Sequence, residues 1–106
     1  MTTINTLQCE DVPAWLEQND TMILDCRDVS DYRTGHLDGA MHSHDDLVEG
    51  LIRKGDKQKA MLIYCYTGHR SEHLTEFFTG FGFQNVHNMA GGYTRWQSLN
   101  GLAATE

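Results

Sequence analysis

A cysteine and an arginine stand five positions apart in this chain, where an apolar run gives way to a helical pattern. Cys65 directly follows the run 60–64, and the segment 65–71 leads into the helical pattern. The residues of this segment are Cys65, Tyr66, Thr67, Gly68, His69, Arg70 and Ser71. A thiol at a strand-to-helix turn faces backbone N–H groups and a positive helix end, which favour the thiolate. Because the thiolate is the nucleophilic form, the pattern predicts a nucleophilic site.

The loop that follows Cys65 is suited to holding one negatively charged atom. Gly68 allows a backbone conformation that other residues avoid, so successive N–H groups can converge on one point. Arg70 adds a permanent positive charge. The pattern favours a site for a thiolate or persulfide over a structural cysteine with a surface arginine nearby. Cysteine-dependent phosphatases need one more residue before the arginine, and Ser71 stands at that position, so phosphoryl transfer is disfavoured.

The rest of the chain predicts an α/β fold that would place this loop at the edge of a sheet. Apolar runs of strand length alternate with helical patterns, which indicates βα units and a mostly parallel sheet. Strands are expected near residues 4–7, 21–26, 39–42, 60–64 and 85–89. Helices are expected over 10–17, 45–54, 70–81 and after 91–92, with a helical turn and loop in 28–39. Since ligands bind beyond the carboxyl ends of parallel strands, Cys65 and the cluster 25–27 are expected at one edge.

Composition and charge exclude several classes of partner. The length of 106 residues predicts one domain, 1–106. The net charge of −7 offers no basic surface for nucleic acid, and it slows the approach of anions, so any anion site must be local. No stretch approaches the roughly 20 apolar residues of a membrane span. The N-terminal residues lack the pattern of a signal peptide, so we expect no membrane partner and a cytoplasmic location.

The remaining cysteines and the histidines have less specific interpretations. Three widely spaced cysteines, Cys9, Cys26 and Cys65, favour free thiols over disulfides. Cys26 is interpreted as a small buried side chain rather than as a thiol that resolves a persulfide. Two histidine pairs, 42/44 and 69/73, have no further ligands at zinc-site spacing, so no metal is expected.

Several aromatic residues are interpreted as core residues. The spacing of three and four residues predicts one apolar helix face, expected to lie in the core rather than to form a partner groove. This face consists of Leu74, Phe77, Phe78 and Phe81. Trp15 and Trp96 are also expected to be packing residues.

Three polar residues are expected to support the site rather than to take part in chemistry. Asp25 and Arg27 alternate with Cys26, so on a strand they share the opposite face and are expected to form an ion pair or hydrogen bonds. His36 lies in a tight segment and is expected to bond backbone groups rather than to act as a base.

Three blocks of sequence together resemble the single-domain rhodanese family. The segments 25–27 (DCR) and 31–40 (DYRTGHLDGA) are similar to the family pattern D-x-R…[ED]-[YF]-x-x-G-H-[IL]-x-G-A. The segment 65–71 (CYTGHRS) matches C-x-x-G-x-R-S, and 91–96 (GGYTRW) resembles G-G-x-x-x-W. The chain differs from the family at Cys26, usually valine or isoleucine, and at 41–44 (MHSH), where an aliphatic-proline pair is usual. All three blocks in this order are highly specific.

The resemblance implies a fold and an activity. The implied fold is rhodanese-like, with a parallel five-stranded sheet and helices on both faces. The implied reaction has Cys65 take sulfur from a donor such as thiosulfate and pass it, as a persulfide, to cyanide, a thiol or a sulfur-carrier protein, without a cofactor. The amides of residues 66–71 would hold the persulfide, and Arg70 would orient the anionic donor. The alternative is a sulfur-carrier or protein-interaction module that a protein persulfide donor loads, with little thiosulfate activity.

Overall fold

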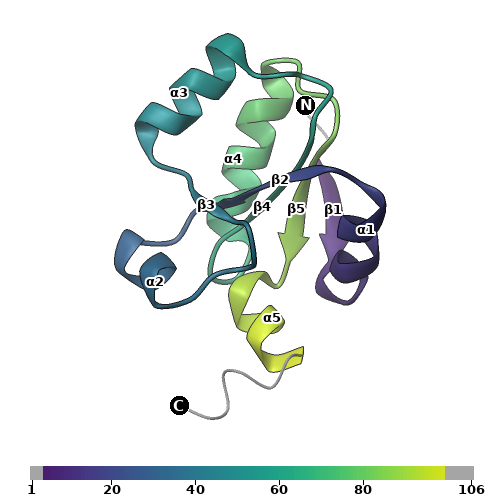
Figure 1. Cartoon of the computed structure of the whole chain (residues 1–106), viewed down its shortest axis with the longest axis vertical. Coiled ribbons are helices and arrows are strands. Elements are labelled where there is room, and N and C mark those ends of the chain that lie inside the picture. Colours follow the sequence, from purple (N-terminus) through teal and green to yellow (C-terminus); the bar gives the residue numbers. More distant parts are fainter. Residues whose placement is uncertain (1–3, 100–106) are drawn as a thin grey trace.

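A central parallel sheet organises the protein. The computed structural model describes residues 4–99, in which five strands pair in the order β1-β5-β4-β2-β3, all parallel (Figure 1). The strands are β1 (Asn5–Gln8), β2 (Thr21–Asp25), β3 (Met41–His42), β4 (Ala60–Tyr64) and β5 (Val86–Ala90). All five residues of β4 are buried, as expected for a central strand that is covered on both faces. The predicted fold class is confirmed.

Helices cover both faces of this sheet. They are α1 (Val12–Gln18), α2 (Val29–Thr34), α3 (Asp45–Lys54), α4 (His69–Gly80) and α5 (Gly92–Leu99), with a short 3₁₀ turn η1 (Cys9–Asp11) before α1. Side chains of α1, α2 and α5 pack on a core that includes Leu62 and Tyr64. Side chains of α3 and α4 pack on a second core that includes Leu24 and Ile63. Figure 1 shows α3 and α4 together on one side of the sheet. Alternate residues of β4 therefore face different cores.

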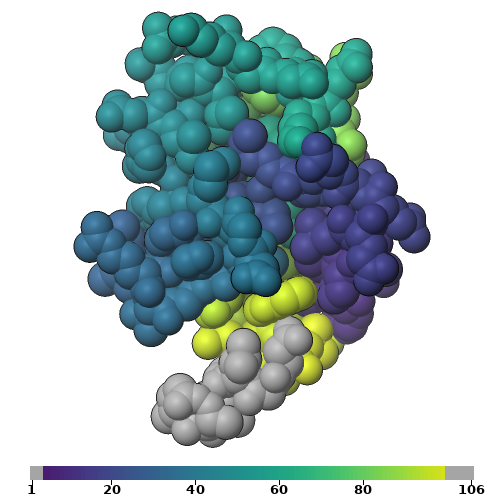
Figure 2. Space-filling model, viewed as in Figure 1, coloured from purple at the N-terminus to yellow at the C-terminus, as the bar shows by residue number. Residues whose placement is uncertain are grey.

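The two ends of the described chain lie side by side. Strand β1 pairs with β5, and η1 contacts α5. Arg95 of α5 forms an ion pair with Glu10 at 2.7 Å. In the space-filling view, the purple N-terminal segment borders the yellow segment of α5 (Figure 2). Between residues 4 and 99, no helix is long and apolar enough to cross a membrane.

The predicted apolar face of the helix 70–81 is partly wrong. Phe78 is fully buried and Leu74 packs against the second core, but Phe77 and Phe81 are 45% and 48% exposed. The physical reason is geometric, because the sheet covers only part of the circumference of α4. Side chains at the flank of an apolar stripe remain outside the contact even when their spacing matches it. By contrast, both predicted packing tryptophans, Trp15 and Trp96, pack against the first core.

Candidate functional site

The ends of β2 and β4 bring the two predicted clusters to one edge of the sheet. The register pairs Asp25 with Tyr64, so the next residue of each strand, Cys26 and Cys65, leaves the sheet at the same level. The Cys26 amide donates to the Tyr64 carbonyl at 2.8 Å, which holds these ends together. The expectation that both clusters share an edge is therefore confirmed.

The sulfur of Cys65 lies inside a ring of hydrogen-bond donors. The side chain is only 2% exposed. Its Sγ accepts from the amides of Gly68 at 3.2 Å and Ser71 at 3.4 Å, and the Ser71 hydroxyl lies 3.3 Å away. The chain turns back over the sulfur at Gly68, whose φ of 109° lies where other residues are strained. The predicted convergence of N–H groups is present, and it centres on the sulfur.

These donors determine the charge state of Cys65. Burial by itself raises the pKa of the thiol, because it disfavours the charged form. Hydrogen bonds from the Ser71 hydroxyl and from the amides of Ser71, Gly68 and Thr67 outweigh that penalty, and the pKa lies below its ordinary value. The loop therefore stabilises a buried thiolate.

Asn88 supports the loop from β5. It is a buried residue that the sequence analysis did not single out. The Ser71 hydroxyl lies within hydrogen-bond distance of both Asn88 Oδ1 and the Cys65 sulfur, so its single proton can be donated to only one of them at a time. Asn88 Nδ2 donates to the Gly68 carbonyl at 3.4 Å. Thr75 also donates to the Ser71 carbonyl, at 2.7 Å. The one signal in the sequence was an amide side chain within a short predicted strand, which by itself has many explanations.

The start of α5 closes the loop from the opposite side. The amides of Tyr93 and Thr94 donate to the carbonyls of Cys65 at 2.8 Å and Tyr66 at 3.1 Å. This approach requires Gly92, because a Cβ there would lie 2.6 Å from the Cys65 carbonyl oxygen and 2.5 Å from that of Tyr66. Gly92 of the third sequence block therefore has a structural role, because it lets the start of α5 approach and hold the loop that precedes α4.

Arg70 supplies the permanent positive charge of the loop. Its side chain is 57% exposed, and its Nη1 lies 3.4 Å from the Cys26 carbonyl and 3.5 Å from Asp28 Oδ1. The guanidinium lies 5.4 Å from the centre of the Tyr66 ring. These contacts are long, so the group is available to an anion that approaches from solvent. Thr67 and His69 of the loop are also exposed.

The predicted ion pair of Asp25 and Arg27 is present and buried below the loop. Arg27 Nη2 donates to Asp25 Oδ2 at 2.8 Å, and the Tyr64 hydroxyl donates to the same oxygen at 2.7 Å. The guanidinium also lies 3.9 Å from the centre of the Tyr93 ring. Tyr64, which the sequence analysis treated only as part of a strand, thus joins β4 to the ion pair. Burial and the neighbouring carboxylate both raise the pKa of this phenol, so it stays a donor.

Comparison with known proteins identifies the family of this chain. The family model of the Rhodanese-like domain matches residues 8–99. The chain belongs to this family. It is 34% identical over 83 residues to a thiosulfate sulfurtransferase GlpE of Pseudomonas entomophila, covering 78% of this chain and 76% of that protein. It is 30% identical to a protein of the same name from Coxiella burnetii, over 86% of this chain and 87% of that protein.

Solved structures agree with the fold of this rhodanese-like domain. The solution structure of a rhodanese-like domain from Anabaena sp. matches it with a TM-score of 0.79 and 25% identity, covering 92% of this chain and 76% of that one. An uncharacterised protein from Saccharomyces cerevisiae matches with a TM-score of 0.77 over 94% and 96% of the two chains. At 22% identity, that second likeness concerns the fold alone.

Three of the six histidines contact backbone atoms. His36 Nδ1 lies 2.7 Å from the Tyr32 carbonyl, as expected for a histidine that bonds backbone groups. His42 Nε2 lies 2.6 Å from the Arg27 carbonyl, and His44 Nδ1 accepts from the first turn of α3. Within residues 4–99, no three His, Cys, Asp or Glu side chains gather so that they could hold a metal ion.

Cys26 differs from Cys65 although it lies at the neighbouring strand end. All three cysteines, which are within the described residues, are free thiols. Cys26 packs against the second core and is half-buried. Burial raises its pKa to about 12, with only a partial opposing effect from the Ser43 hydroxyl. A thiol that stays protonated is a poor nucleophile, which favours the packing interpretation.

Proposed function

We propose that this rhodanese-like domain is a sulfurtransferase that carries sulfane sulfur as a persulfide on Cys65. One observation carries the proposal: the Cys65 sulfur accepts from the amides of Gly68 and Ser71 at the end of β4. The same donors that favour a thiolate can hold the outer sulfur of a persulfide, which also carries one negative charge. Two relatives are named thiosulfate sulfurtransferase, which supports the choice of thiosulfate as the donor.

The proposed reaction has two balanced steps. The Cys65 thiolate attacks the outer sulfur of thiosulfate, a new S–S bond forms, and the old one breaks as its electron pair leaves with sulfite. Arg70 belongs to the same loop and is 57% exposed, and it would pair with the sulfonate oxygens. In the second step, cyanide or a thiolate attacks the outer sulfur of the persulfide, and the electron pair returns to Cys65. No oxidant, reductant or cofactor is consumed.

The test is intact-protein mass spectrometry after incubation with thiosulfate and removal of the excess. We expect a gain of one sulfur that is discharged by cyanide as thiocyanate and is absent in Cys65→Ala. The variant is a suitable control because the thiol is small, and its folding can be checked by circular dichroism. Sulfur uptake by a folded Cys65→Ala protein would contradict the proposal, because the nucleophile would then lie elsewhere.

A second candidate is a sulfur carrier that a protein persulfide donor loads. The observation that favours it is Asp28, whose carboxylate lies 3.5 Å from Arg70 and would oppose a dianion such as thiosulfate. The net charge of −7 acts in the same direction at long range. Saturation at sub-millimolar thiosulfate would favour the enzyme, whereas a rate that never saturates would favour the carrier.

A further inference from the structure

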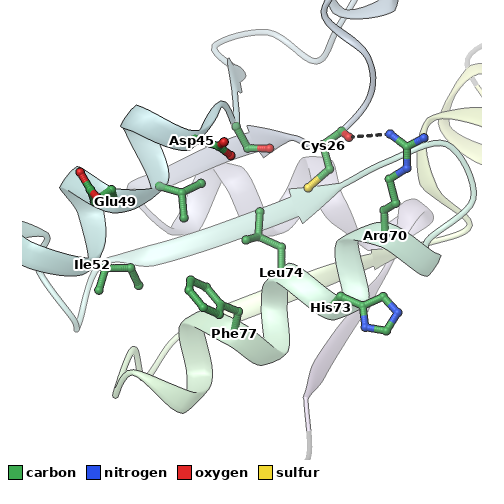
Figure 3. A pocket seen from close by; sticks show the side chains of 10 residues that line it. Cys26, Asp45, Glu49, Ile52, Arg70, His73, Leu74 and Phe77 are labelled. Atoms are coloured by element: carbon green, nitrogen blue, oxygen red, sulfur yellow. Dashed lines mark hydrogen bonds between the residues drawn. The ribbon is translucent and has the colours of Figure 1, made fainter.

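Residues of the loop after β4 line two cavities, which belong to different faces of the sheet. One cavity lies between α3 and α4, measures about 650 Å³, and includes Arg70 and Phe77 in its lining (Figure 3). The other measures about 410 Å³ and is lined by residues of α2 and α5 and by Tyr66. We call this second cavity the α2–α5 pocket. The residues of 4–99 that line it do not include Cys65, whose sulfur is held by donors at the start of α4.

A buried arginine lines the α2–α5 pocket. Arg27 is only 5% exposed, and its Nε and Nη2 both donate to the Asp25 carboxylate. Nη2 donates to the Gly35 carbonyl as well. The other terminal nitrogen, Nη1, has no hydrogen-bond partner within residues 4–99. Because a guanidinium can donate from both terminal nitrogens, one of its edges is available to a ligand.

Tyr93 brings a second donor without a partner to the same pocket. It is 8% exposed, and the Arg27 guanidinium lies 3.9 Å from the centre of its ring. Its hydroxyl lies beside Gly35, where a Cβ would come within 3.1 Å of the oxygen, and it has no hydrogen-bond partner in the described chain. In that part of the chain, the one fully enclosed side-chain nitrogen or oxygen without a partner is His87 Nδ1. The Tyr93 hydroxyl and Arg27 Nη1 are therefore open to the pocket that both residues line.

Two such donors call for an acceptor that a ligand supplies. Polar groups of buried residues are nearly always hydrogen-bonded, so two that open into one cavity indicate a binding site. A carboxylate suits them, because its oxygens accept from a guanidinium and a phenol at once. The volume of about 410 Å³ is in the range of small-molecule sites.

The charges around the α2–α5 pocket restrict the ligand further. The Asp25 carboxylate already balances the charge of Arg27. Asp31 also lines the pocket, and it accepts a hydrogen bond from the Tyr66 hydroxyl through Oδ2. This second carboxylate repels a dianion such as sulfate and attracts a cationic group. The pocket therefore suits a molecule that carries one carboxylate and one ammonium group.

We propose that the α2–α5 pocket binds a free α-amino acid. Its carboxylate accepts from Arg27 Nη1 and the Tyr93 hydroxyl, and its ammonium group pairs with Asp31. The side chain of the amino acid lies against the tyrosine rings that line the pocket. No bond is made or broken, so the proposal does not depend on the sulfur chemistry of Cys65.

Amide NMR with the common L-amino acids tests the proposal. Each is added at about 10 mM, which saturates most of a site whose dissociation constant is near 1 mM. We expect at least one amino acid to shift the signals of α2 and of the start of α5. Its matched amine, which lacks the carboxylate, and its matched acid, which lacks the ammonium group, should each bind at least about tenfold more weakly. The proposal is overturned if no amino acid shifts these signals, or if the matched acid or inorganic sulfate binds as tightly.

Tyr93→Phe removes the unpaired hydroxyl and little else. We expect the affinity for the amino acid to fall about tenfold, whereas the thermal unfolding midpoint should not fall, because the hydroxyl has no partner in the free protein. The matched control is Tyr32→Phe, which removes a hydroxyl that donates to the Ala40 carbonyl at 2.8 Å, outside the pocket. It should leave the affinity unchanged. Equal affinities of Tyr93→Phe and the wild type would contradict the assigned carboxylate position.

Two further variants test the ammonium position and the separation from the sulfur site. Asp31→Asn should weaken binding of the amino acid but not of its matched acid, because only the former presents a cation to this side chain. Cys65→Ala cannot carry sulfur and should bind the amino acid with unchanged affinity. Loss of binding in a folded Cys65→Ala protein would show that the ligand occupies the sulfur site, which would overturn the proposal of a separate pocket.

Discussion

Cys26 and Cys65 follow neighbouring parallel strands at the same register, yet their thiols have opposite chemistry. Burial raises the pKa of both thiols, and it takes that of Cys26 to about 12. For Cys65 the hydrogen bonds from Ser71, Gly68 and Thr67 more than compensate, and the pKa falls below its ordinary value. Position at the end of a strand therefore does not make a thiol reactive. A thiol becomes reactive when several hydrogen-bond donors point at its sulfur.

The chain after each cysteine explains the difference. After Cys65 it turns at Gly68, and two amides return to the sulfur. After Cys26 the next amide, that of Arg27, donates to Asp25 Oδ1 at 2.9 Å instead. One strand end thus uses its backbone donors to stabilise a thiolate, whereas the other uses them to hold a buried ion pair. Four changes would break or sharpen this contrast.

The largest effect is expected from Gly92→Ala, because the new Cβ would overlap the carbonyls of Cys65 and Tyr66. The loop would have to move away from its donors, which should raise the pKa of Cys65 toward that of an ordinary thiol. We expect a loss of about 3 kcal/mol in the free energy of unfolding. Urea unfolding and the pH dependence of sulfur uptake measure the two effects.

The control for Gly92→Ala is Gly50→Ala in α3. A Cβ at Gly50 meets no atom within 4 Å, so the same substitution there should stabilise the protein, by about 0.5–1 kcal/mol. If both variants had the same unfolding free energy as the wild type, the contact between α5 and the loop would have no energetic importance.

Ser71→Ala should make Cys65 more like Cys26 without unfolding the protein. It removes the hydroxyl donor and keeps both amides, so the pKa of Cys65 should rise. Below that pKa the thiolate fraction falls as pH falls, so the pH profile of sulfur uptake should move to higher pH. At any pH well below the pKa, a rise of one unit would slow uptake about tenfold. Thr79→Ala, which removes a hydroxyl from the far end of α4, should leave the profile in place.

Asp28→Asn tests the role of Arg70, the cation that joins the loop after β4 to the residues that follow β2. Arg70 contacts both Asp28 and the Cys26 carbonyl, and loss of the carboxylate should leave its charge free for thiosulfate. We expect kcat/KM for thiosulfate to rise about threefold at low ionic strength and less at high salt, since the pair is exposed. Arg70→Ala should have the opposite effect. A decrease in kcat/KM in Asp28→Asn would show that the carboxylate positions Arg70 instead of competing with the donor.

The smallest effect is expected from Cys26→Ser. A hydroxyl in place of a half-buried thiol should cost about 1 kcal/mol of unfolding free energy or less, and sulfur uptake should persist. Thermal unfolding and mass spectrometry measure both. Complete loss of sulfur uptake in a folded Cys26→Ser protein would contradict the packing interpretation and assign this thiol a part in the chemistry.

Local sequence patterns determined much of the fold. The bounds of the helix 45–54 and the strand 60–64 agree with α3 and β4. The predicted helix over 10–17 instead divides into η1 and α1, with Pro13 in the first turn of α1, where its missing amide is tolerated. Periodicity, glycine and proline report on residues a few positions apart, which is why such elements can be read without tertiary information.

The sequence by itself also determined the candidate site, because Cys65, Gly68, Arg70 and Ser71 lie within one short segment. Only the tertiary structure revealed that Asn88 and Gly92, which are distant along the chain, fasten that segment from β5 and α5. It also decided that Phe77 lines an open pocket instead of joining the core. A local pattern specifies which residues share a face of an element, whereas the packing of distant elements decides how much of that face is covered.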